Sequence, residues 1–125
     1  MNTRTVLLAQ QPKEVNFTMV LGDMALSLFS RQLTGLEADA VADLSVDKTT
    51  FKFNSVDFSY HRIIASVHDQ KTKQAVFNAE DFEALKSLPS SLLNTLREKV
   101  SEANNDLNQV DIDSKKKSSK ATKEK

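Results

Sequence analysis

The densest group of side chains that could do chemistry is acidic. Glu80, Asp81 and Glu83 fall within four positions, just before a leucine-rich run. Carboxyl groups act as general acids or bases when a pocket and a partner group shift their pKa. The same residues also suit the first turn of a helix, where unpaired N–H groups and the helix dipole favour negative charge. Because Asn78 is a good N-cap directly before them, we expect a helix start and a solvated cluster.

The two histidines are the next candidates, as metal ligands. His61 and His68 lie seven positions apart and would share one face of a helix. A zinc site needs three or four ligands, and neither a third histidine nor a carboxylate stands at ligand spacing around them. The chain also has no cysteine, which excludes thiolate ligands and disulfides. We therefore expect no metal site, and a helix C-terminus near His68 that favours a cation.

Patterns for a catalytic nucleophile or a phosphate-binding loop do not occur. The sequence has no Gly-x-Ser-x-Gly elbow, and only two histidines could serve as a base. Its two glycines, Gly22 and Gly35, lie too far apart to cradle a phosphate. These features predict a protein that is not an enzyme and binds no cofactor.

The C-terminal end is the one basic segment. Residues 1–110 carry 11 Lys and Arg against 14 Asp and Glu, a net charge of −3, whereas residues 111–125 carry 6 against 3, a net charge of +3. Lysines can neutralise phosphates, but this tail has no arginine and no aromatic residue to stack on a base. Since its apolar content is too low to offset the entropy of ordering, we expect a disordered tail over residues 109–125. A solubility role is favoured over nucleic-acid binding.

The rest of the chain, residues 1–108, is expected to form a single domain that begins with a β-hairpin. Apolar residues alternate with mostly polar ones on both sides of Gly22-Asp23, a pair that suits a type II′ turn. That turn predicts a register with the large apolar side chains on one face. The predicted pairs are Leu21 with Met24, Met19 with Leu26, and Phe17 with Leu28.

Three to four helices are expected after the hairpin, which makes the fold class α+β. Thr34 and Glu37 form a capping-box pattern that predicts a helix over about 35–44 with an apolar stripe of Leu36, Ala40 and Leu44. Apolar residues at helical spacing predict further helices over about 55–67, 79–88 and 90–107. Residues 3–11 suit one or two helical turns that end at Pro12, and residues 46–54 suit a short strand or an ordered loop. No apolar run is long enough for a transmembrane helix.

The order of the elements forms a pattern over roughly residues 15–105. The hairpin VNFTMVLGDMALSLF leads into the acidic segment RQLTGLEADAV. A helix, a polar turn, an acidic helix start, a Leu-x-x-Leu-Pro pattern and a leucine-rich helix that ends in asparagine follow in FSYHRIIASVHDQKTKQAVFNAEDFEALKSLPSSLLNTLREKVSEANN. In this order of elements the chain resembles the tail assembly chaperones of long-tailed bacteriophages.

This resemblance implies a non-catalytic protein that binds the tape measure protein while tail tube protein subunits polymerise around it. It implies self-association, action in the host cell cytoplasm and absence from the mature virion. A longer form made by ribosomal frameshifting is also typical of the family, and the codons for Lys115-Lys116-Lys117 would be A-rich, as a slippery site requires.

The candidate contact residues are apolar and lie near the two ends of the expected domain. They are Leu7 and Leu8 in the N-terminal arm and Leu92, Leu96 and Val100 in the last helix. Each of these side chains could instead fill the core. The alternative function is a small phage-encoded protein that binds nucleic acid or a host factor through its lysine-rich tail.

Overall fold

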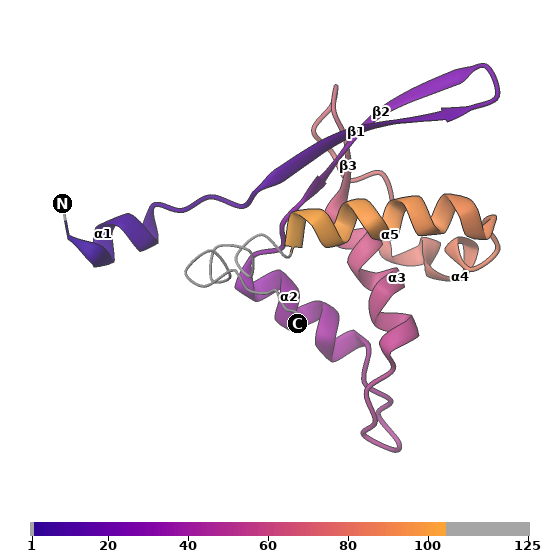
Figure 1. Cartoon of the computed structure of the whole chain (residues 1–125). Helices are drawn as coiled ribbons and strands as arrows, with labels where there is room; N and C mark the ends of the chain where they lie inside the picture. Colours follow the sequence, from indigo (N-terminus) through magenta and orange to yellow (C-terminus); the bar gives the residue numbers. More distant parts are fainter. Residues whose placement is uncertain (1, 105–125) are drawn as a thin grey trace, which may run out of the picture.

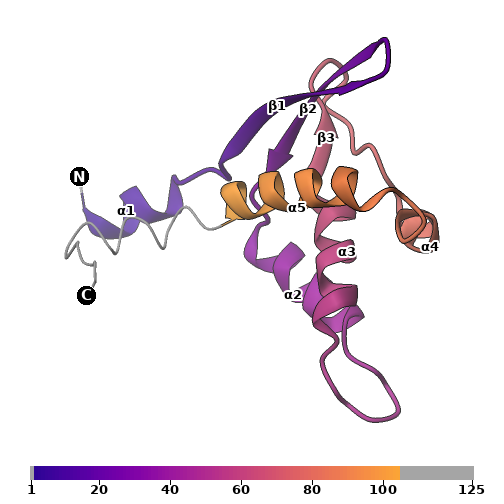
Figure 2. The same ribbon diagram turned by 45° about the vertical axis from the view of Figure 1, so that its right-hand side comes forward.

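The computed structural model describes residues 2–104 and has an α+β fold (Figure 1). Strands β1 (Glu14–Leu21), β2 (Met24–Arg31) and β3 (Val67–Asp69) form an antiparallel sheet in the order β1-β2-β3. Helix α5 (Ser90–Asn104) packs against β1, β2 and helix α3 (Ser55–Ser66). Helix α2 (Gly35–Leu44) packs against α3 on the far side from the hairpin (Figure 2). The predicted disorder of residues 109–125, and Leu107, lie outside the described residues.

The β1–β2 hairpin has the predicted register. Leu21 pairs with Met24, and the pairing continues through Glu14 with Arg31. Gly22 has a φ of 62°, the left-handed backbone that the first central position of a type II′ turn needs. The expected apolar face is buried only at its base, where Phe17 is 8% exposed. At the other end of the same face Met24 is 64% exposed, because no helix reaches that far.

Helix α2 begins where the capping box predicts and ends at the predicted residue, Leu44. The Thr34 hydroxyl accepts a hydrogen bond from the Glu37 N–H at 3.2 Å, and the Glu37 carboxylate accepts one from the Thr34 N–H at 3.0 Å. The predicted apolar stripe is wrong, since Leu36 and Leu44 are exposed and Val41 is the buried residue. Within residues 2–104 the main packing partner of α2 is α3, and Val41 is the apolar side chain that this helix buries.

Helix α3 starts at the predicted cap but ends sooner than expected. The Asn54 side chain accepts hydrogen bonds from the N–H groups of Val56 and Asp57, each at 3.0 Å. After Ser66 the chain becomes extended and adds β3 to the edge of β2. His68 therefore lies in a strand, and the expectation that it shares a helix face with His61 is wrong. Buried Ser30 and Ser66 join the two elements through a 2.9 Å hydroxyl–hydroxyl hydrogen bond.

The acidic segment forms a broken helix before α5. It comprises the 3-10 turn η1 (Ala79–Asp81) and helix α4 (Phe82–Leu85). Leu85 is 1% exposed and anchors this segment in the core. Pro89 follows, and its carbonyl accepts the first backbone hydrogen bond of α5, from Leu93 at 3.2 Å. The start at Asn78 is confirmed, whereas the predicted continuous helix to Leu88 is replaced by these two short pieces.

The hydrophobic core lies between the base of the hairpin and the helices α3, α4 and α5. Its most deeply buried members come from separate parts of the chain, so the core closes only when α5 packs on the sheet. The core residues are Phe17, Met19, Leu28, Tyr60, Ile63, Val67, Leu85, Leu93, Leu96 and Val100.

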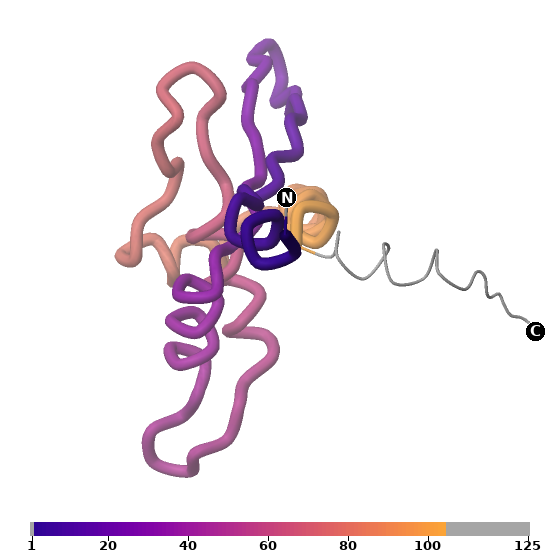
Figure 3. The backbone as a smooth tube through the Cα atoms, turned by 90° about the vertical axis from the view of Figure 1, so that its left-hand side faces the viewer, coloured from indigo at the N-terminus to yellow at the C-terminus, as the bar shows by residue number. Residues whose placement is uncertain are grey.

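Two segments project from this core. Helix α1 (Thr3–Leu8), capped by Asn2, extends away from the rest of the chain and has no buried residue within the described part (Figure 1). The α2–α3 loop, residues 45–54, projects opposite the hairpin (Figure 3). Within this loop Val46 and Phe53 form an isolated bridge, and Phe51 has a φ of 60°. The loop alternative of the sequence prediction is therefore correct. No helix in residues 2–104 is both long and apolar enough to cross a membrane.

Candidate functional site

Apart from Leu36 and Val76, the exposed large apolar side chains of residues 2–104 fall in three separate places. The first is the arm, helix α1, with Val6, Leu7 and Leu8. The second is the hairpin tip, defined as Val20, Leu21 and Met24. The third surrounds the α2–α3 loop and comprises Leu44, Phe51, Phe53 and Val56. Exposed apolar side chains that gather in patches mark surfaces that other molecules cover.

The arm is an exposed helix of six residues. Leu7 and Leu8 are 65% and 68% exposed, as contact residues would need to be. Isolated helices of this length are marginal in water, because nucleation costs more than a few hydrogen bonds return. The Asn2 cap, which accepts a hydrogen bond from the Thr5 N–H at 2.8 Å, is the local feature that favours the turn. The arm is therefore a segment that contact with another surface would stabilise.

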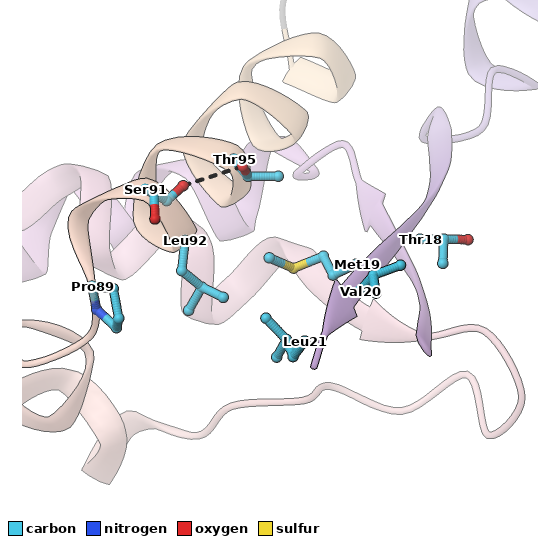
Figure 4. A pocket seen from close by; sticks show the side chains of 8 residues that line it. All are labelled: Thr18, Met19, Val20, Leu21, Pro89, Ser91, Leu92 and Thr95. Carbon is cyan, nitrogen blue, oxygen red and sulfur yellow. Dashed lines mark hydrogen bonds between the residues drawn. The ribbon is translucent and has the colours of Figure 1, made fainter. Parts of the chain in front are cut away.

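An open groove separates the hairpin tip from the start of α5 (Figure 4). Its volume is about 380 Å³, and Met19 and Leu21 line it from the strand while Pro89 and Leu92 line it from the helix side. The Thr95 hydroxyl donates a hydrogen bond to the Ser91 carbonyl at 3.2 Å, so it adds no free donor to the groove. With its apolar walls and polar edge, the groove suits the apolar face of an amphipathic segment.

A second apolar groove lies between α2, α3 and the 3-10 turn η1. It has a volume of about 350 Å³, and its walls are mainly Ala40, Val41, Leu44, Ile64 and Ala65. Glu37 stands at its edge and is already paired with Arg31 at 2.6 Å. This hydrogen bond to Arg31 is the main cause that lowers the pKa of Glu37. The groove therefore offers apolar surface and a neutralised carboxylate.

The candidate contact residues of α5 divide into two kinds. Leu92 is partly buried and lines the groove beside the hairpin tip. Leu96 and Val100 are 2% and 3% exposed, so they fill the core and offer no surface in this structure. The structure also does not bring Leu92 near Leu7 and Leu8, since α1 and the hairpin tip lie at opposite sides of the molecule (Figures 1 and 2).

The acidic cluster has structural partners. The Asn78 side chain accepts from the Glu80 N–H at 2.9 Å, and the Asp81 carboxylate accepts from the Asn78 N–H at 2.9 Å. Glu83 forms an exposed ion pair with Lys86 at 3.4 Å. These contacts are those of a capped helix start, so the expectation of a helix terminus at this cluster is confirmed.

The histidines are packed against aromatic rings. His61 stacks on Phe82 with 4.4 Å between ring centroids, and partial burial lowers its pKa. His68 stacks on Phe29 at 5.1 Å, and its Nδ1 lies 2.8 Å from the Ser66 carbonyl oxygen. No group of three potential metal ligands occurs among residues 2–104.

Sequence reasoning missed the hairpin tip and the α2–α3 loop as exposed apolar surfaces. Val20 stands at an outward position of β1, and this could have been read from the alternation. The exposure of Leu21 and Met24 depends instead on where α5 begins, which no local pattern reports.

We found no match to the chain among protein-family models, curated proteins or solved structures.

Proposed function

We propose that the protein is a phage tail assembly chaperone that binds the tape measure protein while tail tube protein subunits assemble around it. The observation that carries this proposal is the exposed apolar surface, which occurs at the arm, the hairpin tip and the α2–α3 loop. A long amphipathic client helix needs its apolar face covered in water, and an apolar groove provides that cover without chemistry.

Several small contacts suit a client that must later be released. Each groove is short, with a volume of about 380 Å³ beside the hairpin tip and about 350 Å³ between α2 and α3. Single contacts of this size are weak, but when many copies bind along one extended client, multivalency raises the overall avidity. The incoming tail tube protein then displaces the copies one at a time. On this proposal the protein acts in the host cell cytoplasm and is absent from the mature virion.

The exposed arm suits contact between neighbouring copies or with the client. Leu7, Leu8 and Leu92 stay the predicted contact residues, because all three keep accessible surface. The proposal also includes a longer form of the protein, made by ribosomal frameshifting at the codons of the lysine-rich tail. Reading the codons for Lys115-Lys116-Lys117 tests the frameshift, since an interrupted adenine run without an overlapping frame contradicts it.

The direct test is co-expression with the tape measure protein of the same phage. The wild-type chain is expected to co-purify with the client and to raise its soluble fraction. Replacing Leu21 and Met24 by Asp should lower the yield of complex, because each charge would have to be desolvated when the client covers the hairpin tip. The matched control is Val76→Asp, since Val76 is 43% exposed and Leu21 is 45% exposed, but Val76 lies in another loop. A wild-type chain that leaves the client insoluble and unbound would refute the proposal.

Removal of residues 111–125 separates the proposal from the nucleic-acid alternative. Binding to the tape measure protein should persist without the tail, because the exposed apolar groups belong to residues 2–104. If the tail instead carried the function, the full chain would bind DNA or RNA with a strong salt dependence and the shortened chain would not. The second result would favour the alternative.

A further inference from the structure

Two arginines from different helices meet at a small pocket between α3 and α5. The pocket has a volume of about 130 Å³, and Arg62 of α3 and Arg97 of α5 line it together with Ser59 and Ser101. Ile63 and Val100 form its apolar part. Neither the tail assembly chaperone resemblance nor the apolar surfaces described above account for this pair of cations.

Neither guanidinium has a carboxylate partner within residues 2–104. Arg97 donates from Nε to the Ser59 hydroxyl at 3.2 Å and from Nη1 to the Asn94 side chain at 3.3 Å. The Arg62 guanidinium makes no hydrogen bond to any described residue. A guanidinium has five N–H donors and no acceptor, so several donors of the pair remain open for an oxyanion.

Each of the two guanidinium groups lies over an aromatic ring. Arg62 lies 5.5 Å from the centroid of the Phe58 ring, and Arg97 lies 5.2 Å from that of the Tyr60 ring. Such cation–π contacts favour these positions of the two charges and use none of their N–H donors. Burial also lowers the pKa of Arg62, which shows that its charge has lost part of its hydration. Arginine nevertheless stays charged at neutral pH.

A larger groove of mixed polarity continues from the same arginine. Arg62 also lines a groove of about 280 Å³, whose apolar walls are Leu33, Ala38 and Phe58 and whose polar walls are Gln32 and Asn104. A ligand that reaches both spaces would present a negative group to the two arginines and an apolar group to Leu33 and Phe58. This combination is found in an acidic residue with an apolar neighbour on one face of a polypeptide helix.

We propose that the Arg62–Arg97 pocket binds a carboxylate side chain of the client helix, with an apolar side chain of the same helix in the adjoining groove. This inference rests on the proposed function and adds the chemistry that gives the contact its register. Arginine pairs with carboxylates through paired N–H donors, so the contact favours a defined position along the client, as apolar contacts alone do not. A nucleic acid is the poorer partner, because residues 1–110 carry a net charge of −3 and the pocket has room for one small group.

The test is a titration of the full ¹⁵N-labelled chain with a model peptide, followed by NMR. The probe is a capped, alanine-rich helical peptide with one Glu and one Leu at i, i+4 spacing, and its partner probe has Gln in place of Glu. The Glu peptide should shift the side-chain Nε–H signals of Arg62 and Arg97 and the backbone signal of Ser101. The Gln peptide should bind roughly tenfold more weakly, because it lacks the charge-assisted hydrogen bonds to the arginines.

Three outcomes would overturn the inference. Equal affinity for the Glu and Gln peptides would show that no carboxylate is recognised. The same shifts with sodium acetate alone at the same concentration would show a site for small anions only. Shifts confined to the hairpin tip, or none at all, would remove the site from client binding.

Variants of the two arginines distinguish a failure of this inference from a failure of the proposed function. The double variant Arg62→Gln with Arg97→Gln should lose the preference for the Glu peptide, and Arg62→Lys should keep part of it. The matched control is Arg4→Gln, because Arg4 is exposed on the arm and far from the pocket. If the double variant still retains the tape measure protein at wild-type yield, this inference fails while the proposed function stands. If the wild type retains no client, the proposed function fails first.

Discussion

The two ends of one hairpin face have the same pattern but different surroundings. Phe17 and Leu28 at the base are 8% and 7% exposed, whereas Leu21 and Met24 at the tip are 45% and 64% exposed. All four stand in one unbroken antiparallel ladder. The difference is the cover, since α5 packs on the base and an open groove separates its first turn from the tip. Alternation thus identifies which face is apolar, and tertiary packing decides how much of that face is buried.

The largest effect should come from removing a covering side chain of α5. Leu96→Ala is expected to lower the free energy of unfolding by about 2–5 kcal/mol, because it leaves a cavity under the base of the hairpin. Leu7→Ala in the arm is the matched change and should alter it by less than about 0.5 kcal/mol, since Leu7 is 65% exposed. Urea unfolding followed by circular dichroism measures both. Similar losses for the two variants would contradict the division between a covered base and an uncovered surface.

A smaller effect is expected where β3 joins the base. The Ser66 hydroxyl donates to the Arg31 carbonyl at 2.6 Å and bonds the Ser30 hydroxyl at 2.9 Å, and both serines are fully buried. Ser66→Ala should therefore cost about 1–3 kcal/mol, because it leaves a buried hydroxyl without this partner. Ser27→Ala, at a partly buried position further along β2, is the control and should cost less. Equal unfolding midpoints in urea for Ser66→Ala and the wild type would rule out this structural role.

These two comparisons explain what could be predicted from the sequence. The hairpin register and the bounds of α2 depend on local chemistry, namely the Gly22-Asp23 turn and the Thr34–Glu37 capping box, so both were predictable. Strand β3 was missed because Val67 continues the apolar spacing of α3. Its extended form depends on the free edge of β2, and that edge is contributed by residues far away in the sequence.

The candidate site was predictable to a smaller extent. The exposure of Leu7 and Leu8 follows from a short arm that ends at Pro12 and has too few apolar residues to form a core. In α5, helical spacing placed Leu92, Leu96 and Val100 on neighbouring positions of one broad apolar face. The spacing did not indicate which of these residues lie at the exposed edge of that face and which at its buried centre. Only the sheet, which packs on that face, decides that Leu96 is buried and Leu92 lines a groove.

The N-caps of α2 and α1 allow a comparison between a helix that packs on another helix and one that does not. Thr34 caps α2, which packs on α3, whereas Asn2 caps the arm, which buries no residue among those described. Thr34→Ala should lower the free energy of unfolding by about 1 kcal/mol, because the cap and the packing of α2 are lost together. Asn2→Ala should leave the global value unchanged and only increase fraying of the arm. Hydrogen exchange at the Thr5 and Glu37 amides distinguishes the two results, and a global loss in both variants would show that the arm is coupled to the core.

The smallest effect concerns pH and the ion pair between Arg31, at the end of β2, and Glu37 of α2. The hydrogen bond from Arg31 is the largest cause that holds the pKa of Glu37 below its ordinary value of 4.5. A carboxyl group with a lowered pKa in the folded state contributes stability that is present above the unfolded pKa and is lost as the pH falls through the folded pKa. The wild type should therefore lose this contribution progressively as the pH falls below 4.5, and Glu37→Gln should lack that part of the pH dependence. The contribution is small because the Glu37 side chain is 36% exposed and screened by solvent.

Urea midpoints of the wild type and Glu37→Gln between pH 7 and low pH measure this contribution, with Glu83→Gln as the control for an exposed ion pair. Parallel pH profiles for the wild type and Glu37→Gln would show that α2 is held in place by its cap and by the burial of Val41 rather than by this charge pair.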